Sequence, residues 1–216
     1  MPKQPPKSLR QPEQKTPEDG VSRRAFLKGA GLTAAGTTVL NSGLLAQSPS
    51  SGSHVSGPGP VLITLNVNGT PRRLQVEPRT TLAEALRVEL DLTGTKVVCD
   101  RGSCSACTVL LDGTPVNSCM TFAADVGDRQ VTTIEGLARG NELHPVQAAF
   151  IEHDGLQCGY CTPGMVMSCA ALLQRNPDPT MADVRQACSG NLCRCGTYPK
   201  VFEAALAAAK SARRGA

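Results

Sequence analysis

Eight of the ten cysteines fall into two tight groups, and these are the residues whose type and spacing could do chemistry. The first group has the spacing C-x4-C-x2-C-x11-C and consists of Cys99, Cys104, Cys107 and Cys119. Its first three members match the ligand spacing of plant-type 2Fe-2S proteins, in which a fourth thiolate comes from elsewhere in the chain. The loop between them is built from small residues that let backbone N–H groups approach sulfur, namely Gly102, Ser103, Ser105 and Ala106. A zinc site more often shows paired C-x2-C knuckles, and a disulfide would not explain this loop, so the group predicts a 2Fe-2S cluster.

The second group consists of two close pairs, Cys158 with Cys161 and Cys193 with Cys195. Each pair lies between two expected helices, at their ends, so that four thiolates could meet at one site. On spacing alone, zinc competes with an iron-sulfur cluster for this set. A thioredoxin-like redox role is disfavoured, because no βαβ pattern surrounds the C-x2-C pair.

The first group needs a small α+β unit to hold it, and residues 61–136 carry the pattern of one. Alternating apolar residues around Asn68-Gly69 predict one hairpin, and Asp112-Gly113 predicts the turn of a second. Residues 131–134 are expected to form the last strand. Between the hairpins a Thr-x-x-Glu capping box opens one helix, whose apolar side consists of Leu82, Ala85, Leu86 and Leu90.

Residues 137–210 are expected to form a second, helical domain. From His144 onward its apolar residues repeat with a helical period, which predicts four short helices around the second group. The first begins at Pro145, and the second opens with Thr162 as its cap and Pro163 as its first helical residue. The third begins at Thr180 and the fourth at Pro199. The expected inward residues are Val146, Ala149 and Phe150, then Met165, Val166, Cys169, Leu172 and Leu173, then Met181, Val184 and Cys188, then Val201, Phe202, Ala205, Leu206 and Ala209.

Residues 1–46 are expected to be an export signal preceded by a disordered stretch. Residues 1–21 are rich in Pro, Lys, Gln and Glu and contain no periodic apolar pattern. The sequence Ser22-Arg23-Arg24-Ala25-Phe26-Leu27-Lys28 then precedes a short apolar run, which is typical of a twin-arginine signal. A Sec signal or a chance arginine pair is the alternative. Cleavage near Ala46 or Ser53 and retention as an anchor both stay open.

Composition excludes several classes of function. The net charge of +4 comes entirely from residues 1–60, so the folded part is neutral and offers no support for nucleic-acid binding. Residues 47–60 are Ser-, Gly- and Pro-rich, as in a linker, and residues 211–216 form a tail. Ten cysteines in 216 residues are too few for a disulfide scaffold.

Two sequence motifs after the ferredoxin-like run resemble a known family. They are Gln-Cys-Gly-Tyr-Cys-Thr-Pro-Gly-Met, from residue 157, and Ser-Gly-Asn-Leu-Cys-Arg-Cys-Gly, from residue 189. Together they resemble the iron-sulfur subunit of the molybdenum hydroxylases, the xanthine oxidase family, over residues 61–209. The resemblance implies an N-terminal β-grasp, plant-ferredoxin-like domain and a C-terminal four-helix domain. It also implies that both cysteine groups hold 2Fe-2S clusters and that Gln157 contacts the pterin of a molybdenum cofactor on a partner.

The same resemblance implies an electron-transfer subunit with no substrate-converting residue of its own. Electrons would pass from a molybdopterin-binding large subunit through the two clusters to an FAD-binding subunit or another acceptor. The twin-arginine segment adds a narrower resemblance to periplasmic aldehyde oxidoreductases, and it implies the twin-arginine export machinery as a partner. A subunit of an N-heterocycle or carbon monoxide dehydrogenase is the alternative within the family. One departure is Gly196-Thr197-Tyr198, where many members have Thr-Gly-Tyr.

A rival from another class is a secreted, disulfide-linked binding protein, because an exported chain meets an oxidising compartment. Its weakness is that Cys193 and Cys195 are too close to pair easily. The remaining cysteines, Cys169 and Cys188, are expected to be buried thiols that act as small hydrophobic residues. His144 and His153 are expected to cap helices or face solvent rather than bind metal.

Overall fold

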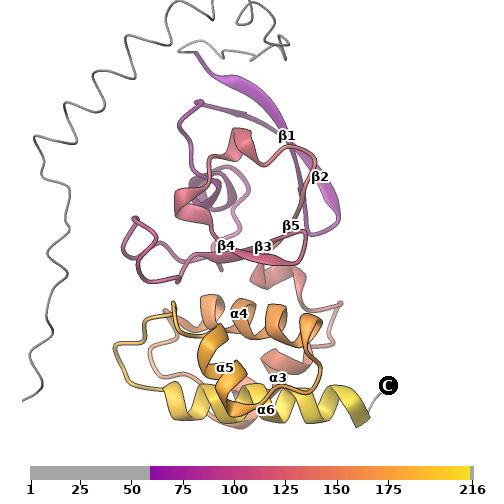
Figure 1. The fold of residues 1–216 in the computed structure, drawn as a ribbon. Coiled ribbons are helices and arrows are strands. Elements are labelled where there is room, and N and C mark those ends of the chain that lie inside the picture. The colour runs from indigo at the N-terminus through magenta and orange to yellow at the C-terminus, as the bar shows by residue number, and fades with distance from the viewer. Residues whose placement is uncertain (1–58, 215–216) are drawn as a thin grey trace, which may run out of the picture. The chain divides into compact units, whose positions relative to one another are not determined.

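A mixed five-stranded sheet forms the first half of the described chain in this computed structural model (Figure 1). The structure describes residues 59–214, which all lie within one compact unit. The strands are β1 (Val61–Val67), β2 (Thr70–Val76), β3 (Thr108–Leu111), β4 (Thr114–Asn117) and β5 (Gln130–Thr132). Their order is β2-β1-β5-β3-β4, in which β5 runs parallel to β1 and all other neighbours are antiparallel. With the helices that follow, this sheet gives the expected α+β class.

Both predicted hairpin turns are confirmed. Asn68 and Gly69 have φ angles of 51° and 77°, and Asp112 and Gly113 have φ angles of 48° and 77°. Two successive residues with positive φ characterise a type I′ turn, whose twist matches that of the flanking strands. The turns therefore set the register, in which Val67 pairs with Thr70 and Leu111 pairs with Thr114.

The helix after the first hairpin departs from the prediction. Helix α2 (Leu82–Glu84) begins with the predicted capping box, in which Thr81 N–H donates to Glu84 Oε2 at 2.8 Å. The chain then widens into a π-helical turn, Ala85–Glu89, closed by a hydrogen bond from Leu90 N–H to the carbonyl of Ala85. The predicted continuous α-helix is therefore wrong after Glu84. Leu90, which follows this turn, is half-buried and packs against the apolar cluster of the sheet half.

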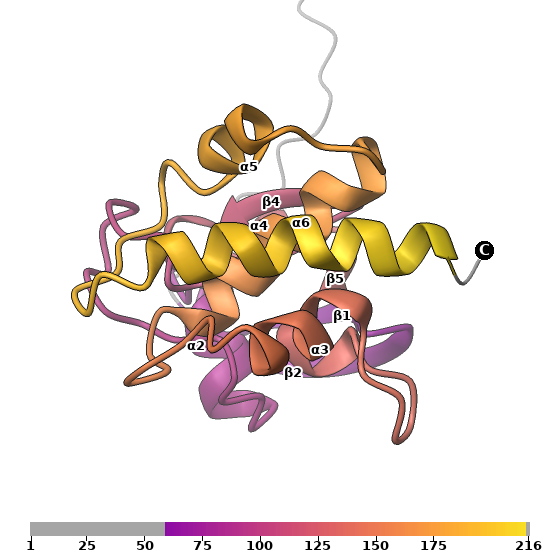
Figure 2. The same ribbon diagram turned by 90° about the horizontal axis from the view of Figure 1, so that it is seen from below.

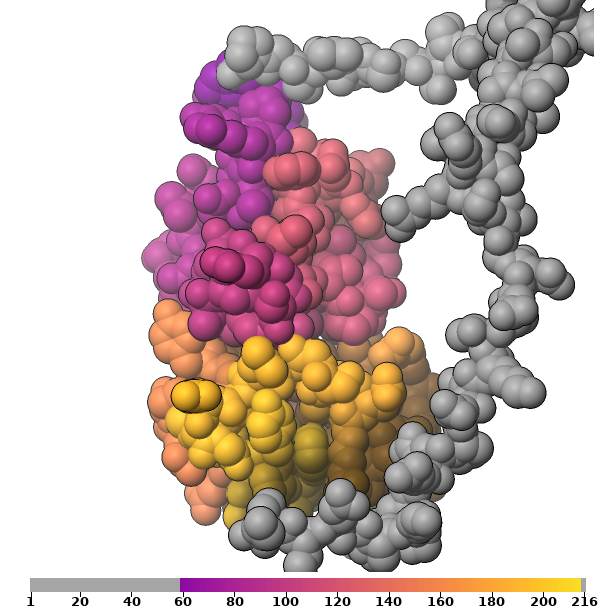
Figure 3. Space-filling model, turned by 60° about the vertical axis from the view of Figure 1, so that its left-hand side comes forward, coloured from indigo at the N-terminus to yellow at the C-terminus, as the bar shows by residue number. Residues whose placement is uncertain are grey.

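Strand β3 is buried on both faces. Val109 and Leu111 pack in one apolar cluster with the residues of β1, β2 and α2. Leu110, between them, packs in a second cluster with the helices of the other half. Alternate side chains of a strand point to opposite faces, so one strand contributes to both cores. Figures 1 and 3 show the two halves in direct contact beside β3 and β4.

The second half of the chain contains the helices α3 (Pro145–Glu152), α4 (Thr162–Arg175), α5 (Met181–Ala187) and α6 (Tyr198–Arg214). Helix α6 lies across the face turned away from the sheet and packs against α3 and α5 (Figure 2). It continues to Arg214, so most of the expected tail is helical. None of the described helices is both long and apolar enough to cross a bilayer.

Three predictions about these helices are wrong. Thr162 is the first residue of α4 rather than its cap, which is Cys161, and the buried Thr162 hydroxyl has no hydrogen-bond partner. Helix α4 also buries an unbroken run of residues 164–172 rather than one stripe. The reason is its position, since α4 is packed between β3 on one side and the other helices on the other. In α5, Met181 was expected inside but is 37% exposed, while Val184 and Cys188 are buried.

The predicted export signal and nearly all of the predicted linker lie outside the described residues.

Candidate metal centres

The first cysteine group lies around the loop that leads into β3. Three of its thiols, those of Cys104, Cys107 and Cys119, belong to buried residues, and Cys99 is half-buried. Cys119 follows β4 in a short turn, Ser118–Met120, so the second hairpin returns the fourth cysteine to the loop that holds the other three. The structure therefore brings this group together as the spacing predicted.

The loop is wound by three residues with positive φ, Asp100, Gly102 and Ser105. This winding turns the N–H group of Ser103 toward Cys99 Sγ, at 3.3 Å. The side chain of Asn117, in β4, donates to the carbonyl of Gly102 at 3.1 Å and ties the loop to the sheet. An N–H group aimed at sulfur stabilises a thiolate ligand, which is the chemistry expected around an iron-sulfur cluster.

The pKa values differ within the first group. A hydrogen bond with the backbone of Arg101 is the main cause that lowers the pKa of Cys99 to about 7. Burial, reinforced by the neighbouring Cys107, raises the pKa of Cys119 to about 11. Cys119 thus keeps its proton at neutral pH until a metal ion replaces it.

The second group lies where the α3–α4 connection meets the α5–α6 connection. Cys161 is at the start of α4, Cys193 is half-buried just before α6, and Cys158 and Cys195 are exposed. The prediction that both pairs sit at helix ends is confirmed. The thiol of Cys193 lies 3.1 Å from Thr197 Oγ1, within hydrogen-bond distance, and its N–H group donates to the hydroxyl of Tyr198 at 2.8 Å.

The pKa values of the thiols in the second group also differ from one another. Burial raises the pKa of Cys161 to about 12, and the adjacent Cys193 adds to the effect. Burial also opposes ionisation of Cys193, but hydrogen bonds from Thr197, Cys161 and Gly196 outweigh it and lower the pKa to about 7. Each group therefore pairs a readily ionised thiol with one that needs a metal ion to lose its proton.

The two groups open onto one shared cavity of about 460 Å³. Cys99 and Cys104 line it from the sheet half, and Cys158, Cys161 and Cys193 line it from the helical half. Its other walls are mainly apolar and are formed by Val98, Ala106, Tyr160, Leu192, Arg194 and Tyr198. Two predicted centres, far apart in the sequence, are thus neighbours.

The thiol arrangement distinguishes between the alternatives. All ten cysteines are free, which contradicts the disulfide-linked rival. Within residues 59–214, no three Cys, His, Asp or Glu side chains lie close enough to hold one metal ion. A zinc site needs four ligands around a single ion, whereas a 2Fe-2S cluster distributes four thiolates over two irons.

Gln157, the predicted pterin contact, is exposed beside the exposed Cys158. Tyr160 is 53% exposed and does not fill the helical core. Arg194 is exposed between Cys193 and Cys195. The surface that carries the second group is therefore open, while three of the four cysteines in the first group are buried.

The residues expected to play no part in the chemistry are placed outside both groups. Cys169 and Cys188 are buried, as predicted, and their sulfur atoms are 3.6 Å apart in the helical core. His144 caps α3, accepting a hydrogen bond from Val146 N–H at Nδ1, and His153 ends the same helix.

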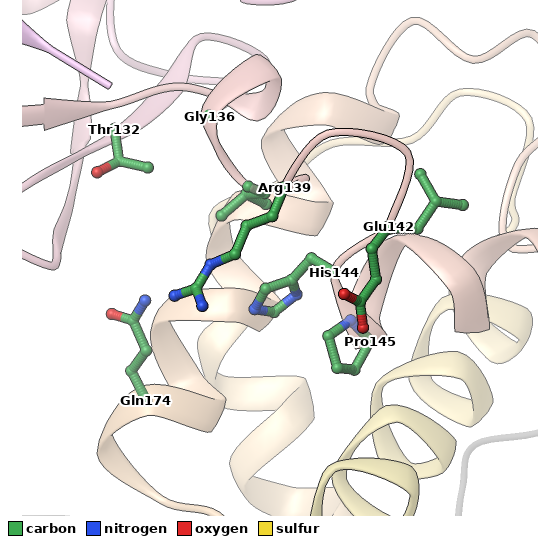
Figure 4. A pocket seen from close by; sticks show the side chains of 9 residues that line it. Thr132, Gly136, Arg139, Glu142, His144, Pro145 and Gln174 are labelled. Atoms are coloured by element: carbon green, nitrogen blue, oxygen red, sulfur yellow. The ribbon is translucent and has the colours of Figure 1, made fainter. Parts of the chain in front are cut away.

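A second pocket lies beside His144 and contains none of the predicted site residues (Figure 4). Arg139 and Gln174 line it as well, and the Arg139 side chain extends toward the Gln174 side of the pocket in the close view. Burial, with the charge of Arg139 as a second cause, lowers the pKa of His144. The neutral imidazole is therefore favoured, which suits its role as a hydrogen-bond acceptor in the cap.

Four residues that support the two groups were missed at the sequence level. Asn191, Thr197 and Tyr198 hold the Cys193 loop through hydrogen bonds, and Gly164 lets α4 approach the first loop. Their position in the sequence could have identified them, since all four lie within four residues of a predicted ligand. Thr197, in the Gly196-Thr197-Tyr198 segment, places its hydroxyl against the thiol of Cys193.

Two known domain families match the chain. The family described as "2Fe-2S iron-sulfur cluster binding domain" matches residues 65–138, and the one described as "[2Fe-2S] binding domain" matches residues 133–206. Together they span both halves of the described structure.

Characterised relatives and solved structures match over most of the chain. The aldehyde oxidoreductase iron-sulfur-binding subunit PaoA of Escherichia coli K12 is 41% identical over 201 residues, covering 85% of this chain and 86% of the relative. The nicotine 6-hydroxylase small subunit of Paenarthrobacter nicotinovorans is 49% identical, covering 68% and 88%. Quinoline 2-oxidoreductase from Pseudomonas putida 86 superposes with a TM-score of 0.69 at 44% identity, covering 72% and 98%. The aldehyde oxidoreductase from Desulfovibrio desulfuricans ATCC 27774 gives 0.68 at 44% identity, covering 71% of this chain but 17% of that one.

Proposed function

This chain belongs to the iron-sulfur subunits of the molybdenum hydroxylase family, and we propose that its two cysteine groups carry electrons away from a molybdopterin centre on a partner subunit. The observation that carries the proposal is the shared cavity, onto which cysteines of both groups open. Two one-electron carriers must be close to exchange electrons, and this arrangement makes the two centres neighbours.

We assign the cluster ligands group by group. Cys99, Cys104, Cys107 and Cys119 hold one 2Fe-2S cluster in a β-grasp, plant-ferredoxin-like domain. Cys158, Cys161, Cys193 and Cys195 hold the other in a four-helix domain. Each cluster supplies a site that accepts and releases one electron. The protein holds the sulfur ligands, aims N–H groups at them and sets their exposure.

The exposure of the second group supports this direction of flow. Gln157 and Cys158 are exposed, so a pterin held by a partner can reach them without any movement of the core. The cysteines of the first group would hold the cluster from which an FAD-binding subunit or another acceptor takes the electron. Several members of the family, including PaoA, are named for aldehyde oxidation, and we propose oxidation of an aldehyde to a carboxylic acid as the reaction served. Relatives named for nicotine and nicotinate favour an N-heterocycle as the second candidate.

Spin counting tests the cluster assignment directly. The anaerobically isolated complex, reduced with dithionite, is expected to give two distinct electron paramagnetic resonance signals that total about two spins per chain, because each reduced 2Fe-2S cluster carries one unpaired electron. Protein without iron, with its cysteines paired in mass spectrometry, would refute the proposal.

We also propose that the chain is exported to the periplasm by the twin-arginine machinery. The support is the sequence from Ser22 to Lys28, with its arginine pair before an apolar run. Iron-sulfur clusters must be inserted before export, and a route for folded proteins would let partners without signals travel in the same complex.

Replacing Arg23 and Arg24 together by lysine is expected to leave the chain and the substrate-oxidising activity in the cytoplasm. Cell fractionation with immunodetection and an aldehyde oxidation assay measures this. The matched control replaces the exposed pair Arg72 and Arg73, on β2, by lysine, and it should export normally. Unchanged periplasmic activity in the Arg23/Arg24 variant would overturn the export proposal.

A further inference from the structure

A hydrogen bond between backbone groups joins the two cysteine loops. The N–H group of Leu192 donates to the carbonyl of Cys104, at 3.1 Å. Leu192 directly precedes Cys193, and both Cys104 and Cys193 line the shared cavity. A continuous route of covalent bonds and one hydrogen bond therefore joins a thiol of the first group to a thiol of the second.

One buried side chain fixes the position of this contact. Asn191 is 2% exposed, and its Nδ2 donates to the carbonyl of Ser105 at 3.1 Å. Its Oδ1 accepts a hydrogen bond from the hydroxyl of Ser168, in α4, at 2.9 Å. The side chain thus ties Ser105, the residue after Cys104, to α4, the helix that Cys161 caps.

The backbone of Asn191 is held just as firmly. Its N–H group donates to the carbonyl of Cys188 at 3.0 Å, and its carbonyl accepts from the hydroxyl of Tyr198 at 3.0 Å. The first contact comes from the end of α5 and the second from the start of α6. Four hydrogen bonds therefore orient this one residue from four segments of the chain.

The chemistry of the position requires a carboxamide. The side chain must accept a hydrogen bond from the Ser168 hydroxyl and donate one to the Ser105 carbonyl. The carboxamide of Asn has both an acceptor and a donor in a short side chain. Aspartate would put an acceptor against the Ser105 carbonyl. An apolar residue would leave that buried carbonyl and the Ser168 hydroxyl without these partners, which is costly inside a protein.

We infer that Asn191 is a positioning residue for electron transfer between the two clusters, because it holds Ser105 and Cys104 against the Leu192 N–H group. The inference rests on the proposed function, since it assumes that both groups hold clusters. In the step itself one cluster loses an electron and the other gains it. No covalent bond forms or breaks, and the oxidation catalysed by the complex supplies the electron.

The test uses the intact complex with Asn191→Ala. Pulse radiolysis delivers one electron per complex, and absorbance follows its redistribution between the clusters, while redox titration gives both potentials. We expect a severalfold slower redistribution with both potentials unchanged. Amide hydrogen exchange at Leu192 is expected to be about tenfold faster, which corresponds to about 1.4 kcal/mol and is the size of one lost hydrogen bond.

Two further variants keep the test decisive. Ser168→Ala removes only the hydroxyl that orients the Asn191 carboxamide, so it should give a smaller change in the same direction even if Asn191→Ala assembles poorly. Asn141→Ala is the matched control, because Asn141 is exposed in the loop before α3. It should leave the redistribution and the exchange unchanged.

The outcomes separate the inference from the function. Wild-type complex without two cluster signals would refute the proposed function. Two normal signals in every variant, with wild-type redistribution and exchange in Asn191→Ala and Ser168→Ala, would overturn the positioning role alone. Shifted potentials with a normal redistribution rate would also overturn it, because Asn191 would then tune a cluster rather than the contact.

Discussion

Cys161→Ala is expected to remove the second cluster and to leave the first in place. Cys161 is the N-terminal cap residue of α4. Burial, with the adjacent Cys193, raises the pKa of its thiol to about 12, so little thiolate forms unless iron displaces the proton. Without this ligand, one iron of the cluster loses a thiolate. Spin counting on the reduced complex should fall from about two spins to about one per chain, and electron flow from substrate to the external acceptor should be lost.

The same helix offers a matched control. Cys169 also lies in α4, but it is buried against Cys188 and belongs to neither group. Cys169→Ala removes a sulfur atom from the core and should cost some stability while both signals remain. If Cys161→Ala kept two signals, or if Cys169→Ala lost one, the ligand assignment would be wrong.

Gly164→Ala is expected to destabilise the protein by about 1–3 kcal/mol, the usual cost of overpacking a tight interior. A Cβ atom at Gly164 would lie 2.2 Å from the carbonyl oxygen of Ser105 and 3.1 Å from Ala106 Cα. Both are backbone atoms of the first cysteine loop, so neither can rotate away. Alanine would gain up to about 1 kcal/mol over glycine in a helix. The clash exceeds this gain, so the net effect is destabilising.

The measurement is the Tm of the complex, which should fall by several degrees. The electron paramagnetic resonance signal of the first cluster should also change shape, because Ser105 and Ala106 lie between two of its ligands. Gly59→Ala is the control, since no atom lies within 4 Å of its Cβ position. A Tm equal to or above that of the wild type would show that the first loop can move away from α4 without cost.

Local signals in the sequence were enough to predict most of the elements. Asn68-Gly69 and Asp112-Gly113 each need two residues with positive φ, and that requirement belongs to the turn itself. The capping box at Thr81 is likewise local, because a side chain and a backbone group three residues apart satisfy each other. Such features do not depend on what packs around them.

The errors arose where distant parts of the chain determine the structure. The π-helical turn after Glu84 has no local signal, and the all-round burial of α4 follows from its place between the sheet and the other helices. Spacing placed Cys119 with Cys99 and Cys107, and Cys161 with Cys158 and Cys193, and the structure has these thiols as neighbours. It could not reveal that the two groups face each other, because the contact of Leu192 with Cys104 joins residues far apart in the sequence.

Strand β3 has a consequence for how this subunit folds and unfolds. Leu110 belongs to the core of the helical half, while Val109 and Leu111 belong to the core of the sheet half. Separating the two halves would expose Leu110 to solvent and leave a cavity among the helices. The separation therefore has a high free-energy cost. The subunit should therefore unfold as one cooperative unit rather than as two independent foldons. Assembly of one cluster would then stabilise the structure around the other. A chain that lacks either cluster would unfold more readily, and proteases would cleave it more readily in both halves.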